Sequence, residues 1–599
     1  MEQDMKLCGE RRLPSELEAD VEAVARKWDG EGLLERVWFR DSQVWTGRDE
    51  SRWLGWLDVP EVPTVVAERL EVFRERLKKD GIRCVAVLGM GGSSVFPRMV
   101  QSVFQGQGDI ELRILDSTDP AQIRTFESTT DLSHTVFVIS SKSGTTLETR
   151  TFYQYFMSRL ETAVGADVAP SRFVVVTDPG SELDVLANRL CFRASFHGEA
   201  SVGGRYSALT YFGMLPAAVL GCDVKVILER AHQMAGACRS TNSATENPGV
   251  LLGLILGCAA KLGRNKLTLV ISDSLSGFGA WIEQLIAEST GKSGVGLIPV
   301  VGEGLGAPNR YGTDRIFMGI GLSGEDDTET DIALTRLADA GHPVVRFSLE
   351  STYDIGAECY RWKFATAVAG AVMKIHPFNQ PDVEGTKLVT RRLIERYDTG
   401  RAVTSQPAVM TQQYGTGQIS LYAPGVYGRG LGRLVPDKRT MKDVLAAHFV
   451  QVRSGDYVAL LAYLEWCDPY RRILDRLRLD IRTSTGAATT VGFGPQFLHS
   501  TGQVHKGGPQ NGLYLVLSCS DIVDVEVPGA CYTFGQLKGA QLLADEDMLT
   551  RRRRRYLRLQ VDGDVADGLV ACSDLLREAL ESTELLDLHD RRILPTHSV

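Results

Sequence analysis

Residues 136–149 read Val-Phe-Val-Ile-Ser-Ser-Lys-Ser-Gly-Thr-Thr-Leu-Glu-Thr. The apolar start predicts a buried strand, and the polar run after it predicts a loop that opens a helix. The first turn of a helix has unpaired N–H groups and the positive end of the helix dipole, so it attracts anions. The loop adds further groups that suit a phosphate, namely Ser141, Lys142, Ser143, Gly144, Thr145 and Thr146. We therefore predict a phosphate-binding loop, with an ordinary Ser/Thr helix cap as the alternative.

Strands alternating with helices surround this loop. Apolar runs predict further strands at 85–88, 112–115 and 173–176. The first of these runs leads into a glycine-rich turn, Gly89-Met90-Gly91-Gly92-Ser93-Ser94. This alternation is typical of a parallel, doubly wound sheet, in which ligands bind beyond the carboxyl ends of the strands.

The same pattern returns after a polar, turn-rich stretch at 236–249. Strands are expected at 267–271, 297–301, 316–320 and 344–347, with a helix at about 280–288. A third region contains a strand at 514–517, and residues 14–55 have apolar residues at helical spacing. We predict an α/β protein with a helical arm (1–55), two doubly wound domains (56–235 and 236–400) and a C-terminal α/β region (401–599).

Composition excludes several classes of protein. A chain of 599 residues with 43% hydrophobic and 24% charged residues is long enough for two to four globular domains. Its net charge of −9 argues against nucleic-acid or membrane-surface binding. The one basic cluster, Arg551–Arg555, follows three acidic residues, so we interpret it as a solvated helix face and not a ligand patch.

The cysteine pattern indicates the redox compartment, and short motifs indicate whether a cofactor is expected. The eleven cysteines form no CxxC pair, which indicates reduced thiols in a cytoplasmic protein. There is no signal-peptide pattern and no apolar run long enough for a membrane span. HExxH, clustered Cys/His and P-loop lysine motifs are missing, so no metal or cofactor is expected.

Four further polar segments interrupt the helices and strands: Gly203-Gly204-Arg205-Tyr206-Ser207, Glu288-Ser289-Thr290-Gly291-Lys292, the stretch from Phe378-Asn379-Gln380 to Lys387, and His499 to Gly508. Each alone has an ordinary structural interpretation, such as a glycine turn or a solvated glutamate. Together with the two earlier loops they resemble the glucose-6-phosphate isomerase family, which has two sugar-isomerase domains.

The resemblance implies an aldose–ketose isomerase of carbohydrate metabolism that acts on hexose 6-phosphates through a cis-enediolate and needs no cofactor. It implies that Glu288 is the base, that Arg205 stabilises the enediolate, and that Lys387 and a histidine open the sugar ring. The implied substrate-binding residues are Gly92, Ser93, Ser141, Lys142, Ser143, Thr145, Thr146, Gly204 and Gln380.

The chain departs from the family pattern at two places. The Phe-Asp-Gln turn reads Phe378-Asn379-Gln380, and the best match to the catalytic histidine segment follows that turn where the family has it before. This order looks like the isomerase half of bacterial transaldolase fusions, so a homodimer and a separate transaldolase are possible partners. Of the two histidines, we prefer His505 over His499, because Gln503 and the glycine-rich entry to the next strand match better.

Two alternatives stay open. A non-catalytic sugar-phosphate regulator would keep the phosphate loop and lack the base, against which Glu288, Arg205 and Lys387 argue together. An NAD-dependent enzyme would use Gly89-x-Gly91-x-x-Ser94 with Asp116 on the ribose, but the third glycine of that fingerprint is replaced by Ser94. A nucleotide-binding assay, compared with an assay for turnover of fructose 6-phosphate without additives, would distinguish these classes.

Overall fold

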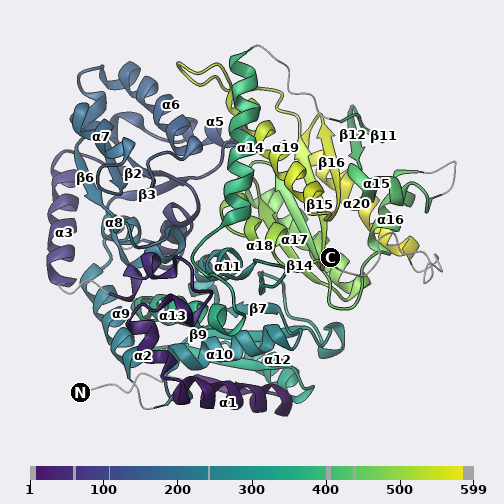
Figure 1. Cartoon of the computed structure of the whole chain (residues 1–599). Helices are drawn as coiled ribbons and strands as arrows, with labels where there is room; N and C mark the ends of the chain where they lie inside the picture. Colours follow the sequence, from purple (N-terminus) through teal and green to yellow (C-terminus); the bar gives the residue numbers. More distant parts are fainter. Residues whose placement is uncertain are drawn as a thin grey trace.

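The computed structural model describes residues 9–58, 63–106, 108–240, 243–399, 406–435 and 440–583. Within them the chain builds three sheets, each flanked by helices, that lie around a central region crossed by helix α11 (Ser276–Thr290) and the lower end of α14 (Pro381–Asp398) (Figure 1). Two sheets are parallel or nearly so and the third is mixed, which confirms the predicted α/β class.

The first sheet has five parallel strands in the order β3-β2-β4-β5-β6. They are β3 (Glu111–Leu115), β2 (Cys84–Gly89), β4 (Thr135–Ser140), β5 (Phe173–Thr177) and β6 (Ala194–His197). The three central strands are buried throughout, because helices cover both faces, and this explains their continuous apolar runs. The helices of this part are α3 (Pro63–Lys79), α4 (Val95–Val103), α5 (Pro120–Ser128), α6 (Leu147–Val164), α7 (Glu182–Arg189) and α8 (Tyr211–Val219).

The second sheet has the order β1-β10-β9-β7-β8 and is parallel except for β1. Its strands are β1 (Glu10–Arg12), β7 (Lys266–Ile271), β8 (Ile298–Val301), β9 (Arg315–Leu322) and β10 (Val344–Leu349). Its helices are α9 (Val224–Arg239), α10 (Pro248–Lys261), α11, α12 (Thr328–Asp339) and α13 (Ile355–Val372). Helices α10 and α13 are buried around most of their circumference, as expected for helices in the middle of a core.

Two expectations about this part need correction. The N-terminal arm contains the helices α1 (Ser15–Gly30) and α2 (Leu33–Trp38), but it begins with β1, which adds an antiparallel edge strand to the second sheet. The stretch 236–249 is not all loop, because α9 continues to Arg239, where an apolar face that includes Cys238 stays buried.

The third sheet is mixed, with the order β11-β12-β16-β15-β13-β14. Its strands are β11 (Met410–Tyr414), β12 (Gly417–Tyr422), β13 (Tyr457–Tyr463), β14 (Ala488–Phe493), β15 (Gly512–Cys519) and β16 (Arg555–Asp562). The accompanying helices are α15 (Gly425–Leu431), α16 (Met441–Phe449), α17 (Asp468–Thr485), α18 (Gly502–Gly507), α19 (Phe534–Arg551) and α20 (Val565–Thr583). Helix α14 precedes this sheet in the chain and packs against α19 through Ile394, Leu537 and Ala540.

A buried ionic cluster joins the second and third sheets. Glu303 forms an ion pair of 2.9 Å with Arg315 of β9, and its carboxylate also accepts hydrogen bonds from the backbone N–H and hydroxyl of Thr489 in β14. Glu303 and Arg315 are almost completely buried, so these contacts replace the water that both charges lose. The third sheet is therefore docked onto the second by specific polar contacts as well as by apolar packing.

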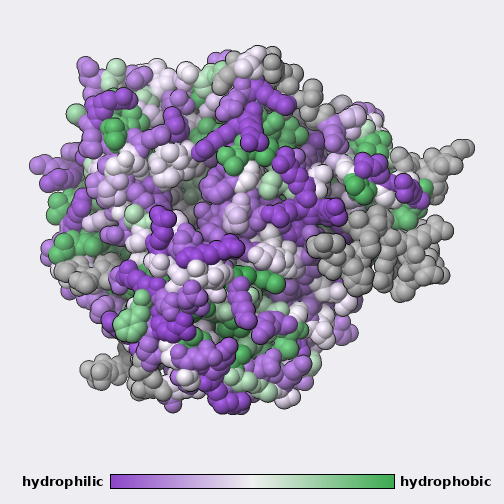
Figure 2. Space-filling model, viewed as in Figure 1, coloured by the Kyte–Doolittle hydropathy of each residue, from purple (hydrophilic) through white to green (hydrophobic). Residues whose placement is uncertain are grey.

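The basic cluster 551–555 is not the solvated helix face that the sequence suggested. Arg551 ends α19, Arg555 begins β16, and both Arg554 and Arg555 are buried. Arg554 donates to the backbone oxygens of Lys506, Gly508 and Pro509, and Arg555 pairs with Asp456. Elsewhere the viewed face of the molecule is mainly hydrophilic, with apolar side chains in small groups (Figure 2). No helix in the described ranges combines the length and apolarity needed to cross a membrane.

Candidate active site

A cavity of about 500 Å³ lies beyond the carboxyl ends of β2 and β4, where the sequence predicted a ligand site. The first sheet supplies the loops after β2 and β4, the second part of the chain supplies α11 and α14, and the third supplies residues near His499 and on α19. Every residue predicted for the site except His505 lines this cavity: Gly92, Ser93, Ser141, Lys142, Ser143, Thr145, Thr146, Gly204, Arg205, Glu288, Gln380 and Lys387.

The polar loop after β4 presents hydroxyls next to a helix N-terminus that no side chain caps. Ser141 Oγ donates to Thr146 Oγ1 at 3.0 Å, and the hydroxyls of Ser143 and Thr145 lie 3.0 Å apart. Lys142 forms an ion pair with Asp178 and donates to the backbone oxygen of Ala200. Free N–H groups, hydroxyls and a lysine ammonium together can hold a phosphate.

Glycines let two loops of the cavity approach each other closely. A Cβ added to Gly92 would lie 2.1 Å from the backbone oxygen of Gly204, so no larger residue fits at position 92 without moving the loop. Gly144 has a φ of +69°, which other residues rarely adopt, and a Cβ there would meet the backbone of Leu183 at 2.9 Å. Glycine at both positions therefore allows the close packing of these loops.

Glu288 lies near the end of α11 and is buried beside Arg205. Its Oε1 is 3.3 Å from Arg205 Nη1, and its Oε2 accepts a hydrogen bond from Gln284 Nε2 at 3.3 Å. Arg205 is fixed in turn, because its guanidinium donates to Ser289 Oγ at 2.7 Å and to Gln380 Oε1 at 3.1 Å. The carboxylate and the guanidinium thus face the cavity in a set orientation.

His499 lines the cavity and is paired with Glu148 of α6. Its Nε2 lies 2.9 Å from Glu148 Oε1, which also accepts a hydrogen bond of 2.7 Å from Gln541 Nε2. Burial by itself raises the pKa of Glu148, but the charge and hydrogen bond of His499 outweigh burial and lower that pKa to about 2. A carboxylate that stays ionised beside an imidazole orients the ring, and an oriented imidazole at a cavity can transfer a proton to a ligand.

The structure places the two candidate histidines differently: His499 lines the cavity, and His505, which the sequence favoured, does not. His505 is buried in α18 outside the cavity lining, its Nδ1 is 2.9 Å from the hydroxyl of Tyr457, and its backbone oxygen accepts from Tyr514. Burial, reinforced by Lys506 and Arg554, lowers the pKa of His505 to about 3, so this ring is neutral near pH 7. Gln503, which had favoured His505, instead holds the start of α14 by accepting from the backbone N–H of Asp382.

Lys387 lies in the second turn of α14 and forms an ion pair of 3.0 Å with Glu384. Burial alone would raise the pKa of Glu384, but the charge and hydrogen bond of Lys387 lower it below the ordinary value. Sequence reasoning missed Glu148, Gln284, Glu384 and Gln541, all of which line the cavity. Glu148 directly follows the polar loop, but its partner His499 is far away in sequence, so no local pattern marks the pair.

The features that suggested other chemistry have partners of their own. Asp116, the possible ribose-binding acid, accepts hydrogen bonds from Arg98 Nε at 3.0 Å and Gln496 Nε2 at 2.7 Å, so its carboxylate is already occupied. Among the described residues, Asp119, Cys519 and Asp521 are grouped as metal ligands can be, but the ammonium of Lys538 contacts both carboxylates, at 2.9 and 2.5 Å. Neither group supports the NAD-dependent alternative or a metal centre.

Comparisons with known proteins identify relatives of this chain. The family model described as phosphoglucose isomerase matches residues 61–298, which include the polar loop, Arg205 and Glu288. A glucose-6-phosphate isomerase from Rubrobacter xylanophilus is 28% identical over 390 residues, covering 56% of this chain and 88% of the relative. A probable glucose-6-phosphate isomerase from Natronomonas pharaonis is 30% identical over 346 residues, covering 52% of this chain and 78% of the relative.

A solved structure supports the fold. The crystal structure of a hypothetical protein from Thermus thermophilus superposes with a TM-score of 0.55 at 24% identity and covers 64% of this chain and 99% of its own. The shared fold, the match of the family model across the polar loop and Glu288, and 30% identity over most of the Natronomonas relative lead to one assignment. The chain belongs to the phosphoglucose isomerase family.

Proposed function

We propose that this protein interconverts glucose 6-phosphate and fructose 6-phosphate by moving one proton between C2 and C1. The observation that carries the proposal is the joint placement of Glu288 and the polar loop 141–146 in one cavity. A carboxylate base and a phosphate anchor in the same space are the minimum that an aldose–ketose isomerase of sugar phosphates requires.

In this proposal the phosphate binds at the start of α6. The uncapped N–H groups and the hydroxyls of Ser141 and Thr146 donate hydrogen bonds to its oxygens, and Lys142 adds positive charge although Asp178 partly neutralises it. These contacts are the same in the ground and transition states, so they fix the sugar in place and contribute mainly to substrate binding.

The sugar ring must open before the proton can move. His499, oriented by Glu148, gives a proton to the ring oxygen O5, and the C1 hydroxyl releases its proton to solvent as the C1–O5 bond breaks and the aldehyde forms. Lys387 lines the same cavity and adds a positive charge near the reacting oxygens. The ring-opening group is therefore the histidine that faces the cavity, in place of His505.

Isomerisation follows on the open chain. Glu288 takes the C2 proton of the aldose, the electron pair forms the C1–C2 double bond, and the negative charge of the enediolate lies on oxygen. Arg205 stabilises that charge, because its guanidinium is already fixed by Ser289 and Gln380 and needs no rearrangement. A proton then moves from the C2 hydroxyl to the C1 oxygen, Glu288 returns its proton to C1, and the C2 oxygen becomes the ketone carbonyl, so Glu288 is regenerated.

A sugar-phosphate regulator is less well supported, because a binding protein has no use for a buried carboxylate beside a fixed arginine. A homodimer and association with a separate transaldolase stay predictions. Residues 9–583 already supply every group that the proposed mechanism uses from one chain.

The test combines turnover with proton exchange. Conversion of fructose 6-phosphate to glucose 6-phosphate, measured in EDTA, should be robust in the wild type. Glu288→Gln removes the base but keeps the shape and the hydrogen bond from Gln284, so kcat should fall by about 10²–10⁴ with little change in KM. Exchange of the C2 hydrogen with deuterated solvent should be lost in parallel. Near-normal turnover and exchange in this variant would overturn the proposal.

A further inference from the structure

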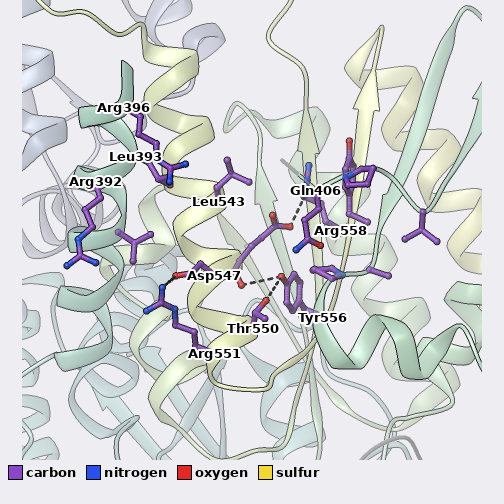
Figure 3. Close-up of a pocket in the computed structure, with 17 residues that line it drawn as sticks. Arg392, Leu393, Arg396, Gln406, Leu543, Asp547, Thr550, Arg551, Tyr556 and Arg558 are labelled. Carbon is purple, nitrogen blue, oxygen red and sulfur yellow. Dashed lines mark hydrogen bonds and ion pairs between the residues drawn. The ribbon is translucent and has the colours of Figure 1, made fainter. Parts of the chain in front are cut away.

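A second cavity, of about 440 Å³, lies on the side of α14 that faces away from the active cavity. It is enclosed by α14, α19 and the β12–β16 side of the third sheet, and Figure 3 shows the side chains that line it. Arg392 and Arg396 extend from α14, and Arg551 from the end of α19. None of the motifs that define the proposed isomerase lies here.

The charges around this cavity are unbalanced. Arg558 is paired with Glu546 at 2.8 Å and Arg551 with Asp547 at 2.8 Å, so these four side chains neutralise one another. Arg392 and Arg396 have neither an ion pair nor a side-chain hydrogen bond within the described part of the chain. They lie one helical turn apart, where like charges repel, in a chain whose net charge is −9. Two unneutralised guanidinium groups at a cavity favour an anionic ligand.

The rest of the lining is apolar or aromatic. Leu393 and Leu543 come from the two helices, Pro407 and Val409 from the strand side, and Tyr422 from the end of β12. The guanidinium of Arg558 lies 3.7 Å from the centre of the Tyr422 ring, and this stacking holds the buried arginine flat against the wall. A ligand that fills this space needs an organic body for the apolar wall as well as an anionic group for the arginines.

We propose that this cavity is a regulatory site for a phosphorylated small molecule, with its phosphate on Arg392 and Arg396 and its organic part against the apolar wall. The planar guanidinium donates paired hydrogen bonds that match phosphate oxygens, and the volume is in the range of small-molecule sites. The same two helices carry groups of the active cavity, Lys387 on α14 and Gln541 on α19. A ligand that draws α14 and α19 together therefore changes the affinity of the active cavity for its own substrate.

The binding test uses three probes: ATP, fructose 1,6-bisphosphate and inorganic phosphate. Calorimetric titration of the wild type is compared with Arg392→Ala/Arg396→Ala and with a matched control, Arg472→Ala/Arg476→Ala. The control removes two exposed arginines, also four residues apart, from α17, which lines neither cavity. A third protein, Ser141→Ala/Thr146→Ala, reports any binding at the phosphate loop of the active cavity.

We expect at least one organic phosphate to bind, and its Kd to rise at least tenfold in Arg392→Ala/Arg396→Ala but not in the other two variants. The organic phosphate that binds more tightly identifies the nucleotide or the sugar phosphate as the ligand source. Absence of binding, equal weakening in the control, or loss only in the phosphate-loop variant would overturn the site. Inorganic phosphate binding as tightly as the organic probes would overturn the role of the apolar wall.

The regulatory part is tested by the KM for fructose 6-phosphate with and without the bound probe. The KM should shift at least twofold in the wild type and in the α17 control, and the shift should disappear in Arg392→Ala/Arg396→Ala. A shift that persists in that variant would indicate competition at the active cavity. Binding that leaves KM unchanged would overturn the regulatory role. Neither outcome depends on which residue is the catalytic base.

Discussion

Arg205 is held in one orientation beside Glu288, because its N–H groups donate hydrogen bonds to other partners as well. Its Nε donates to Ser289 Oγ at 2.7 Å, and one Nη2 bond of 2.7 Å goes to the backbone oxygen of Pro377. Each bond prevents a rotation of the guanidinium, so the positive charge beside Glu288 is set before substrate arrives. This preorganisation is what makes an electrostatic contact effective in a buried site.

Mutation can distinguish the roles of His499 and His505. We expect His499→Ala to reduce turnover of the pyranose form by at least tenfold, and to affect an analogue without the O5 hydroxyl, which cannot form that ring, much less. His505→Ala should lower stability, because it removes a buried ring held by Tyr457, without this difference between substrates. The measurement is the ratio of kcat/KM for the two substrates. An unchanged ratio in His499→Ala would reassign ring opening.

Glu148 should make stability depend on pH. Its folded pKa, about 2, lies below the ordinary 4.5, so its contribution to the free energy of unfolding is complete above about pH 4.5 and is lost as the pH falls toward 2. Glu148→Gln cannot titrate and should lose less stability between pH 5 and pH 3 than the wild type. Denaturant unfolding at several pH values tests this, with the exposed Glu182→Gln as control. Parallel curves for wild type and Glu148→Gln would contradict the assignment.

At the scale of single residues, the sequence predicted functional side chains that lie in local motifs, but it did not predict contacts between residues far apart in the chain. Glu288, Arg205 and Lys387 lie in recognisable segments, and all three line the cavity. Glu148 and His499 are 351 positions apart, so their contact depends on how the third sheet docks. The sequence could not place His499 and His505 for a similar reason, because a short helix turns His505 toward Tyr457 and away from the cavity.

At the scale of elements, the polar loop and the start of α6 act as a unit. Ser141→Ala/Thr146→Ala removes two hydroxyls but leaves the ion pair between Lys142 and Asp178 intact. We expect KM for fructose 6-phosphate to rise about tenfold or more, with a smaller fall in kcat, because phosphate contacts act mainly in binding. Thr162→Ala, near the other end of α6, is the control. An unchanged KM would move the phosphate elsewhere.

Elements were predictable where their pattern was undisturbed. Strands β2 and β4 are continuous buried apolar runs between turns, so their sequences identify them directly. Strand β16 begins inside the arginine run 551–555, and its buried arginines hide the pattern. β1 has only exposed positions, and backbone pairing with β10 alone makes it a strand. Tertiary context, not local propensity, decides such elements.

At the scale of the whole molecule, the contacts of Glu303 hold the second and third sheets together. Glu303→Ala leaves Arg315 buried without its partner and removes two hydrogen bonds to Thr489. We expect the free energy of unfolding to fall by about 3–5 kcal/mol. Activity should fall as well, because His499 and Gln541 reach the cavity only when the third sheet is docked. Unfolding curves and kcat measure both effects, with Glu329→Ala on the exposed side of α12 as control. If neither the stability nor the activity falls, apolar packing alone holds the third sheet against the second.

The residues of the active cavity are also synthesised in a fixed order. During synthesis the polar loop, Arg205 and Glu288 leave the ribosome long before His499 and Gln541, and domains tend to fold as they emerge. A nascent chain that has reached about residue 400 therefore already carries the proposed phosphate anchor and the proposed base, without the proposed ring-opening acid. If those roles hold, such a chain would bind a sugar phosphate without opening a closed one. Catalysis begins only when the third sheet arrives, so its docking is itself the step that turns a binding protein into an enzyme.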